Sequence, residues 1–181
     1  MHQVSMSDAG KHAPQAPLAV GTRFFPELAS ELAGTTTPNL RLESVDPTIL
    51  AVDGGALVAK APGASAVLIS ADDGSVVDFI HVWVAPVTNV TLAKRDGERV
   101  EGSIGLTVGE DLTLVPMLWN GAQKLSGDGG ATWTASDETM LAIMNDGSRD
   151  RRRLRARAPG KTTITVALGE TKASIDVEVV Q

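Results

Sequence analysis

The chain has 181 residues, of which 43% are hydrophobic and none is cysteine, and its formal net charge is −6. This composition excludes global disorder, disulfides and any site that needs a thiolate. Residues 1–86 hold four Lys/Arg against nine Asp/Glu, and residues 87–181 hold twelve against thirteen. Since neither half is strongly basic, we expect no nucleic-acid binding. No apolar run approaches the roughly 20 residues of a transmembrane helix, so we expect no direct membrane insertion.

The first 16 residues contain glycine and proline and show no apolar periodicity, so we expect a flexible leader over residues 1–16. This segment lacks the basic and apolar regions of an export signal, so such a signal has been trimmed or never existed, and we expect the first. From Phe25 to Gly34, Pro26 near the start and a closing glycine are typical of a short helix. The repeat described below favours a strand there instead, and both alternatives stay open.

The rest of the chain consists of short segments that are rich in β-branched or alternating apolar residues and are bounded by Gly, Pro or Asp. Many short strands at close spacing predict an antiparallel sandwich or barrel. Pro86, directly before the predicted strand Val87–Ala93, marks the junction between domains at 17–86 and 87–181. The other predicted strands are Val58–Ala61, Ala66–Ser70, Val76–Val84, Leu112–Leu118, Leu154–Ala158, Thr162–Ala167 and Ala173–Val180.

The second half of the chain repeats the first half in three blocks, in the same order and with small changes of length. Such blocks indicate one fold built twice, with the differences absorbed in loops. Each half contains an Ala-Pro-Gly motif before a late strand. We expect this motif to turn the chain from one sheet to the other, since proline fixes φ and glycine permits a backbone conformation that other residues avoid. The blocks are Val45–Val52 with Ser136–Ile143, Leu57–Gly63 with Leu154–Gly160, and Ile80–Val84 with Ile175–Val179.

Five motifs follow one another in the second half: VGEDLTL at 108–114, ATWTASD at 131–137, LAI at 141–143, APGKTTITV at 158–166 and IDVEV at 175–179. In this order they resemble the bacterial immunoglobulin-like domain of the group 2 type, which occurs in the repeats of invasin- and intimin-like adhesins. The resemblance implies an all-β fold of two tandem immunoglobulin-like β-sandwiches. The first half matches through Val20–Thr22, Ser44–Pro47, Leu50–Val52, Leu57 and Ala61–Gly63, but has Leu42 where the second half has Trp133.

Trp133 is predicted to lie at the centre of the second domain, where its ring fills the space between two sheets. The rest of that core is expected to consist of inward residues on the neighbouring strands. These residues are Leu141, Ile143, Ile164, Val166, Ile175 and Val177.

No catalytic constellation is recognisable in the sequence. The three histidines lack metal-ligand spacing, and there is no nucleophile elbow, phosphate loop or dinucleotide fingerprint. The pattern Asp146-x-Ser148-x-Asp150 resembles part of a calcium loop but lacks the closing acidic ligand, so we expect a solvated turn. We therefore predict no enzyme activity, no cofactor and no metal site.

Arginines alternate along one predicted strand of the second domain. If Leu154 points inward, period-two alternation sends Arg153, Arg155 and Arg157 outward. Together with Arg151 they form a cationic strip that is a candidate for binding an anionic polysaccharide or lipopolysaccharide. Alternatively, neighbouring carboxylates pair with these arginines, or the arginines protect a sheet edge from aggregation.

Alternation in the last strand of the first domain places Phe79, His81 and Trp83 on its outward face, with Leu68 beside them on the neighbouring strand. An apolar surface of this kind is costly in water and marks a covered or binding surface. Three alternatives are open for what lies on this surface. The first is cover by the N-terminal arm or the second domain, the second is a protein partner or a second copy of the chain, and the third is a sugar that stacks on Trp83. The second domain has polar counterparts, namely Ser174, Asp176, Glu178 and Thr165.

The sequence thus predicts a non-enzymatic bacterial module at the cell surface or in another exported structure. We expect it to act as a structural spacer or adhesion unit, with a protein partner or self-association ranked before a surface polysaccharide. The alternatives are a structural subunit of a larger assembly, such as a surface filament, an envelope machine or a phage virion, and a carbohydrate-binding accessory module.

Overall fold

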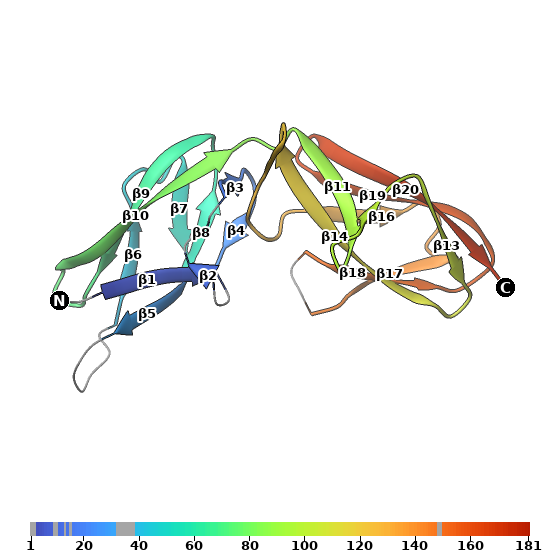
Figure 1. Cartoon of the computed structure of the whole chain (residues 1–181), viewed down its shortest axis with the longest axis horizontal. Coiled ribbons are helices and arrows are strands. Elements are labelled where there is room, and N and C mark those ends of the chain that lie inside the picture. Colours follow the sequence, from blue (N-terminus) through green and yellow to red (C-terminus); the bar gives the residue numbers. More distant parts are fainter. Residues whose placement is uncertain (1–2, 9–10, 13, 15, 32–38, 148–149) are drawn as a thin grey trace. The chain divides into compact units, whose positions relative to one another are not determined.

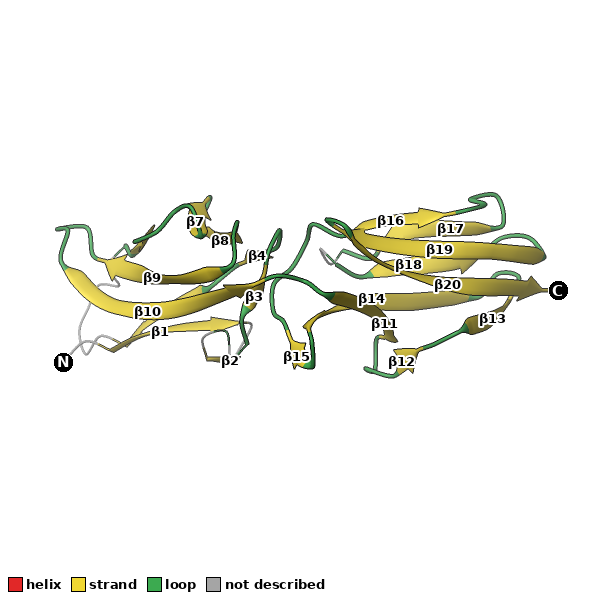
Figure 2. Ribbon diagram, turned by 90° about the horizontal axis from the view of Figure 1, so that it is seen from above, coloured by secondary structure: helices red, strands yellow, loops and turns green. Residues whose placement is uncertain are grey.

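The computed structural model describes residues 3–8, 11–12, 14, 16–31, 39–147 and 150–181. These residues form strands and loops without a helix, which confirms the predicted all-β fold (Figures 1 and 2). The same residues accordingly include no helix that could cross a membrane. Two compact units are present: unit 1 comprises Met1–Pro86 and Gln123–Asp128, and unit 2 comprises Val87–Ala122 and Gly129–Gln181.

Unit 2 is a sandwich of two sheets around one apolar core. One sheet consists of β13 (Ser103–Thr107), β20 (Thr171–Val180), β19 (Gly160–Leu168) and β16 (Thr132–Ala135), in that order. The other consists of β12 (Arg99–Val100), β11 (Asn89–Lys94), β14 (Asp111–Asn120), β18 (Arg152–Ala156) and β17 (Leu141–Asn145). Neighbouring strands are antiparallel except for β13 and β20, which are parallel. This arrangement is the predicted immunoglobulin-like sandwich.

Most of the predicted core of unit 2 is confirmed, with a correction at two positions. Five of the predicted residues are buried, whereas Trp133 and Ile143 are half-buried and pack against the core from its margin. The reason is that β16 and β17 are the edge strands of their sheets. An edge strand has a neighbouring strand on one side only, so its inward side chains can stay partly open on the other side, although Leu141 on β17 is fully buried. The five buried residues are Leu141, Ile164, Val166, Ile175 and Val177.

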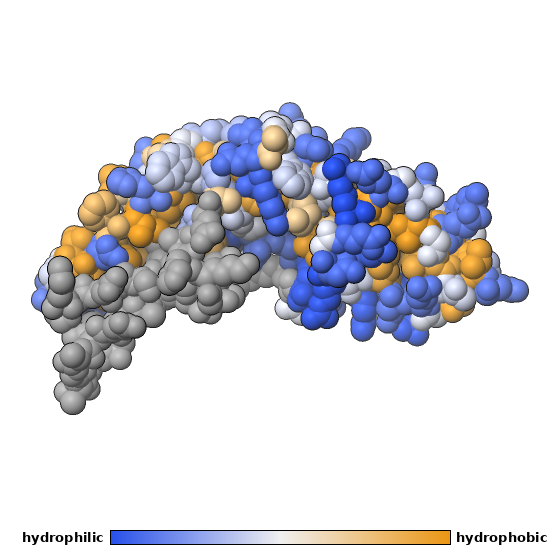
Figure 3. Space-filling model, viewed as in Figure 1, coloured by the Kyte–Doolittle hydropathy of each residue, from blue (hydrophilic) through white to orange (hydrophobic). Residues whose placement is uncertain are grey.

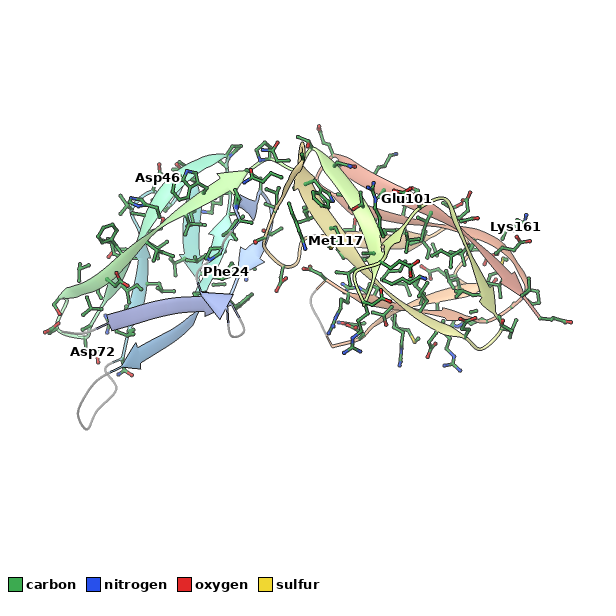
Figure 4. The ribbon with its side chains drawn as sticks, in the orientation of Figure 1. Phe24, Asp46, Asp72, Glu101, Met117 and Lys161 are labelled. Carbon is green, nitrogen blue, oxygen red and sulfur yellow. The ribbon has the colours of Figure 1, made fainter. Side chains whose placement is uncertain are left out.

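Unit 1 repeats this arrangement with shorter strands. One sheet consists of β3 (Leu18–Ala19), β10 (Val76–Ala85), β9 (Gly63–Ser70) and β6 (Arg41–Ser44), and again the first pair is parallel. The remaining strands form the series β4 (Arg23–Phe24), β8 (Ala56–Ala59) and β7 (Leu50–Asp53), and the series β2 (Lys11–His12), β1 (Gln3–Asp8) and β5 (Glu27–Glu31). Phe24 points into the core (Figure 4), which it shares with Leu50, Leu57 and Ile69.

The described part of residues 1–16 differs from the expected flexible leader. β1 pairs with β5, and β2 pairs with β1, as β11 pairs with β14 and β12 pairs with β11 in unit 2. Within Phe25–Gly34, the segment left open between helix and strand, β5 is a strand, and residues 32–34 lie outside the described residues. These strands escaped sequence analysis because they are short, and prolines at 14, 17 and 26 interrupt their periodicity.

Backbone pairing identifies which residues of the two units are equivalent. Gly63 and Gly160 begin β9 and β19, and each pairs with a valine of the following strand. Their φ angles are +149° and +143°, so the permissive glycine predicted after proline is confirmed in both units. Leu42 and Trp133 also occupy one register position, because their partners on β9 and β19 lie equally far from these glycines.

A polar turn is repeated in both units. In unit 2 the Asp137 carboxylate accepts hydrogen bonds from the backbone N and the hydroxyl of Thr139, at 2.9 and 2.6 Å. The buried Thr162 hydroxyl accepts a hydrogen bond of 3.0 Å from the backbone N of Asp137. The repeated Asp-x-Thr of the sequence is therefore a turn that satisfies its own backbone groups. Unit 1 has the same bonds among Asp46, Thr48 and Ser65, and Figure 4 marks the position of Asp46.

Unit 1 also contains the segment Gln123–Asp128, which begins with β15 (Gln123–Lys124). Four backbone hydrogen bonds join this segment to residues 17–23, in the manner of an added strand. The bonds run from Ser126 N to Pro17 O and from Ala19 N to Ser126 O, both at 2.8 Å, from Arg23 N to Asp128 O at 2.8 Å, and from Asp128 N to Arg23 O at 2.6 Å.

Side chains hold the same segment closely. Leu125 is buried, and so is Thr22, whose hydroxyl donates a hydrogen bond of 2.7 Å to the carbonyl oxygen of Ala19. A Cβ atom at Gly127 would collide with the Thr22 side chain, so only glycine fits there without a shift. The segment is thus packed into unit 1 and does not merely lie on its surface.

Candidate binding surface

The four residues proposed for partner binding lie together on the outer face of unit 1, and we call them the aromatic strip. Phe79, His81 and Trp83 alternate with inward residues on β10, and Leu68 on β9 pairs directly with Phe79. Phe79 is 56% exposed and Trp83 is 59% exposed. The ring centroids are 5.7 Å apart between Phe79 and His81 and 6.2 Å apart between His81 and Trp83. The rings therefore form one continuous row.

The neighbouring strand leaves the rings accessible. Ala66 and Ala64 on β9 pair with His81 and Trp83, and these short side chains cover little of the ring faces. Figure 3 shows hydrophobic residues gathered on the part of unit 1 that carries β9 and β10. Exposed aromatic faces beside small residues are suited to contact with another apolar or amphipathic surface.

A pocket of about 430 Å³ borders the strip at His81 and Trp83. Its other walls come from Pro14, Ala16 and Pro17 and from Gln123 of the added segment. Sequence analysis missed these four residues. Gln123 reaches the strip because its segment, Gln123–Asp128, pairs with residues 17–23, which lie far from it in the sequence. No local pattern in the sequence signals that pairing.

The four arginines proposed for anion binding differ in their partners and in their positions. Arg155 Nη1 lies 3.2 Å from the Asp111 carboxylate across the β14–β18 pair, and Arg151 Nε lies 3.3 Å from the Asp146 carboxylate. Carboxylates thus pair with two of the arginines, as one alternative anticipated, and such pairs contribute little where they are exposed. Arg153 points outward on β18, whereas Arg157 follows that strand and lines a separate pocket.

The loop considered as a calcium site uses its carboxylates for other bonds. Asp146 pairs with Arg151, and Asp150 accepts a hydrogen bond from the backbone N of Gly129. Ser148 lies outside the described residues. Among the residues that the structure does describe, no three His, Asp or Glu side chains are grouped as a metal ion would need.

No protein-family model matches the chain, and neither does any curated protein. Among solved structures, domains 4 and 5 of the S-layer protein SbsC match with 19% identity over 99% of this chain and 98% of that chain, with a TM-score of 0.37. The D00-D0 domain of intimin matches with 10% identity over 99% of this chain and 100% of that chain, with a TM-score of 0.37. An endo-fucoidan hydrolase matches with 15% identity over 91% of this chain but 27% of its own, with a TM-score of 0.34. These are likenesses of fold, and they include domains of bacterial surface proteins.

Proposed function

We propose that the chain is a non-enzymatic immunoglobulin-like module of a bacterial surface or exported protein, acting as a spacer and adhesion unit. Its contact surface is the aromatic strip, which binds a protein partner or a second copy of the chain. The observation that carries the proposal is the exposure of Phe79 and Trp83, each more than half accessible on a regular strand. The equivalent strand of unit 2 presents polar side chains, so the fold does not require this surface.

A structural subunit of a larger assembly, such as a surface filament, an envelope machine or a phage virion, would use the same strip for self-association. A carbohydrate-binding accessory module is favoured by a different observation, the pocket of about 430 Å³ beside Trp83 and His81. The indole face of Trp83 and the side-chain amide of Gln123, which both line this pocket, are groups that bind sugars. The structural subunit would therefore bind another copy of the chain and the accessory module a sugar, but both would bind at the aromatic strip.

The test replaces the three ring-bearing residues of the strip with their counterparts in unit 2, Phe79→Ser, His81→Asp and Trp83→Glu in one variant, and leaves Leu68 unchanged. Since all three side chains are exposed, the melting temperature should stay close to that of the parent chain. Concentration-dependent association, measured by sedimentation velocity, should be lost. Val76→Ser is the matched control, because Val76 is 54% exposed on the same strand but lies outside the strip.

The experiment has four informative outcomes. Loss of association at unchanged stability supports the strip as the contact. A parent chain that stays monomeric contradicts contact with a second copy, and glycan-array binding that the triple variant abolishes would favour the carbohydrate module. A large fall in melting temperature would mean that the strip is covered within the chain, because carboxylates without partners would then be buried.

A further inference from the structure

The first strands of unit 2 repeat the part of unit 1 that receives the added segment Gln123–Asp128. β3 and β13 each lie parallel to the last strand of their own unit, and β4 and the start of β14 pair with β8 and β18. Residues 17–23 therefore correspond to residues 105–111, which we call the 105–111 edge. Four backbone hydrogen bonds of 2.9 to 3.1 Å are the same in both units: Val20 N to Ala85 O, Gly21 N to Ala59 O, Thr22 N to Ala19 O and Ala59 N to Thr22 O in unit 1, and Val108 N to Val180 O, Gly109 N to Ala156 O, Glu110 N to Thr107 O and Ala156 N to Glu110 O in unit 2.

The correspondence includes the backbone groups that hold the added segment in unit 1. Their counterparts in unit 2 face away from β20 and β18, because the neighbouring residues make the bonds to those strands. β13 is the edge strand of its sheet, and β11 pairs with β14 only from Leu114 onward. Across the described ranges, no strand therefore pairs with these groups. The counterparts are Gly105 O for Pro17 O, Thr107 N for Ala19 N, and the N and O of Asp111 for those of Arg23.

The two edges differ in their exposure to water. Ala19 and Thr22 are fully buried where the added segment contacts them, whereas their counterparts Thr107 and Glu110 are exposed. Val108 is 40% exposed beside them. Unit 2 thus leaves open an edge that unit 1 covers, and an open edge is a template for pairing with another segment of chain.

One side chain of unit 2 takes the place of the added segment. The Glu110 carboxylate accepts a hydrogen bond of 2.8 Å from the backbone N of Thr107. In unit 1 the corresponding N–H, on Ala19, donates to Ser126 O at 2.8 Å instead. Thr22 has the place of Glu110 there, and its hydroxyl donates to a carbonyl oxygen, which leaves that N–H free for the segment. Glu110 therefore satisfies a donor that an added segment would use.

We propose that the 105–111 edge is a docking site for an extended segment of a further immunoglobulin-like unit, and that Glu110 holds the edge closed until the segment displaces its carboxylate. The segment adds to the edge in the register that Gln123–Asp128 has in unit 1, so that backbone hydrogen bonds supply the affinity. Because the Glu110 side chain is exposed, water replaces the hydrogen bond that it loses, and the displacement costs little.

The charge of the edge restricts which segment docks there. In unit 1, Arg23 lies directly opposite Asp128. Asp111 has the place of Arg23 in unit 2, and like charges directly opposite each other destabilise a strand pair. The docking segment should therefore carry a neutral or basic residue where the segment of unit 1 has Asp128.

The 105–111 edge shares no residue with the aromatic strip, so either proposal can fail without the other. The test titrates the full chain with a peptide of residues 121–130 that carries Asp128→Asn, and it follows backbone amides by NMR. Unit 1 already holds its own segment. The peptide should therefore shift the amides of Thr107 and Asp111 and leave those of Ala19 and Arg23 unchanged.

Glu110→Thr gives the edge the residue that unit 1 has. It should raise the affinity for the peptide by about tenfold over the parent chain, the effect of freeing one hydrogen-bond donor. Glu110→Ala frees the same donor without adding a hydroxyl and should act in the same direction. Glu110→Gln is the matched control, because its amide oxygen still accepts from Thr107 N, and it should keep the parent affinity. Since Glu110 is exposed, all three variants should keep the parent melting temperature.

Three results would each overturn the proposal. The first is the lack of a saturable shift in both Glu110→Thr and Glu110→Ala, which would mean that the edge accepts no segment. The second is equal affinity of these variants and the parent chain, which would mean that Glu110 does not close the edge. The third is equal binding of a peptide with the same residues in scrambled order, which would mean that the register of the added segment is not what binds.

Discussion

Asp46 and Asp137 are the residues at which the repeat is most closely copied. In each unit, the pKa of the aspartate is held below its ordinary value, chiefly by the hydrogen bond from the threonine hydroxyl two residues later and then by that threonine's backbone N–H. Both bonds favour the ionised carboxylate. A turn that is repeated with the same bonds and the same direction of pKa shift therefore contributes to folding through the charged form.

Thr139→Val removes the hydroxyl donor from Asp137 and should raise the pKa of Asp137 toward its ordinary value. Because the folded-state pKa is depressed, the stability that these bonds contribute is present above the unfolded-state pKa and is lost as the pH falls through the folded-state pKa. The variant should thus be less stable than the parent chain near neutral pH, and the difference should shrink in strong acid. Carboxyl resonances followed by NMR against pH measure the shift.

Asp46 provides the internal control for this substitution. It lies in the equivalent turn of unit 1 and keeps its own threonine, Thr48. Its titration midpoint should therefore be the same in the variant and in the parent chain. A common shift of both aspartates, or no shift of Asp137, would contradict the assignment of the hydroxyl as the principal cause.

Alternation in the sequence was enough to predict the direction of single side chains but not their partners. It placed Phe79, His81 and Trp83 outward, and the structure has them there. It could not show that Arg155 pairs with Asp111, because strand pairing brings these two residues together across 44 positions. Nor could it show that Trp133 lies at the margin, since that depends on which strand ends the sheet.

Among the elements, long regular strands were predictable and short ones were not. β19 and β20 carry strict alternation and a glycine turn, and their predicted ranges lie within the observed ones. β1, β2 and β5 lack such signals because their register is fixed by pairing with one another rather than by a local hydrophobic pattern. The added segment Gln123–Asp128 is a further case, since its partners precede it by about a hundred residues.

Gly127→Ala tests how closely that added segment is packed. The new methyl group meets the buried Thr22 side chain, and a φ of +111° is unfavourable for alanine. We expect local opening to become easier by roughly 2 to 4 kcal/mol, from overpacking and backbone strain together. Hydrogen exchange of the Ala19 and Arg23 amides, which donate to the segment, measures this opening directly.

Gly129→Ala separates packing from backbone strain. Gly129 also has a positive φ, of +78°, but nothing lies within 4 Å of a Cβ atom placed there. This control should cost about 1 kcal/mol, since it carries strain alone. If the hydrogen-exchange rates of the Ala19 and Arg23 amides are the same in both variants, the close fit of Gly127 against Thr22 does not contribute to stability.

At the scale of the whole molecule, the two units are not two consecutive stretches of sequence. Unit 2 begins at Val87, yet Gln123–Asp128 groups with unit 1. A polypeptide that ends at Pro86 would leave the backbone groups of Pro17, Ala19 and Arg23 without the partners that this segment supplies. Unit 1 should therefore depend on residues that the repeat assigns to the second half of the chain.

Residues 1–86 prepared alone should consequently be less stable than unit 1 within the full chain. The fragment lacks the partners of four backbone hydrogen bonds and the buried Leu125 side chain, so the free energy of unfolding should be lower for the fragment than for unit 1 in the full chain. Urea unfolding followed by NMR at Leu57 and Ile69 compares the two forms at the same core positions. A synthetic peptide of residues 121–130 should restore the lost stability in a saturable manner, and the same peptide with Gly127→Ala should restore much less. Equal unfolding midpoints for the fragment and the full chain would show that unit 1 is complete without the added segment.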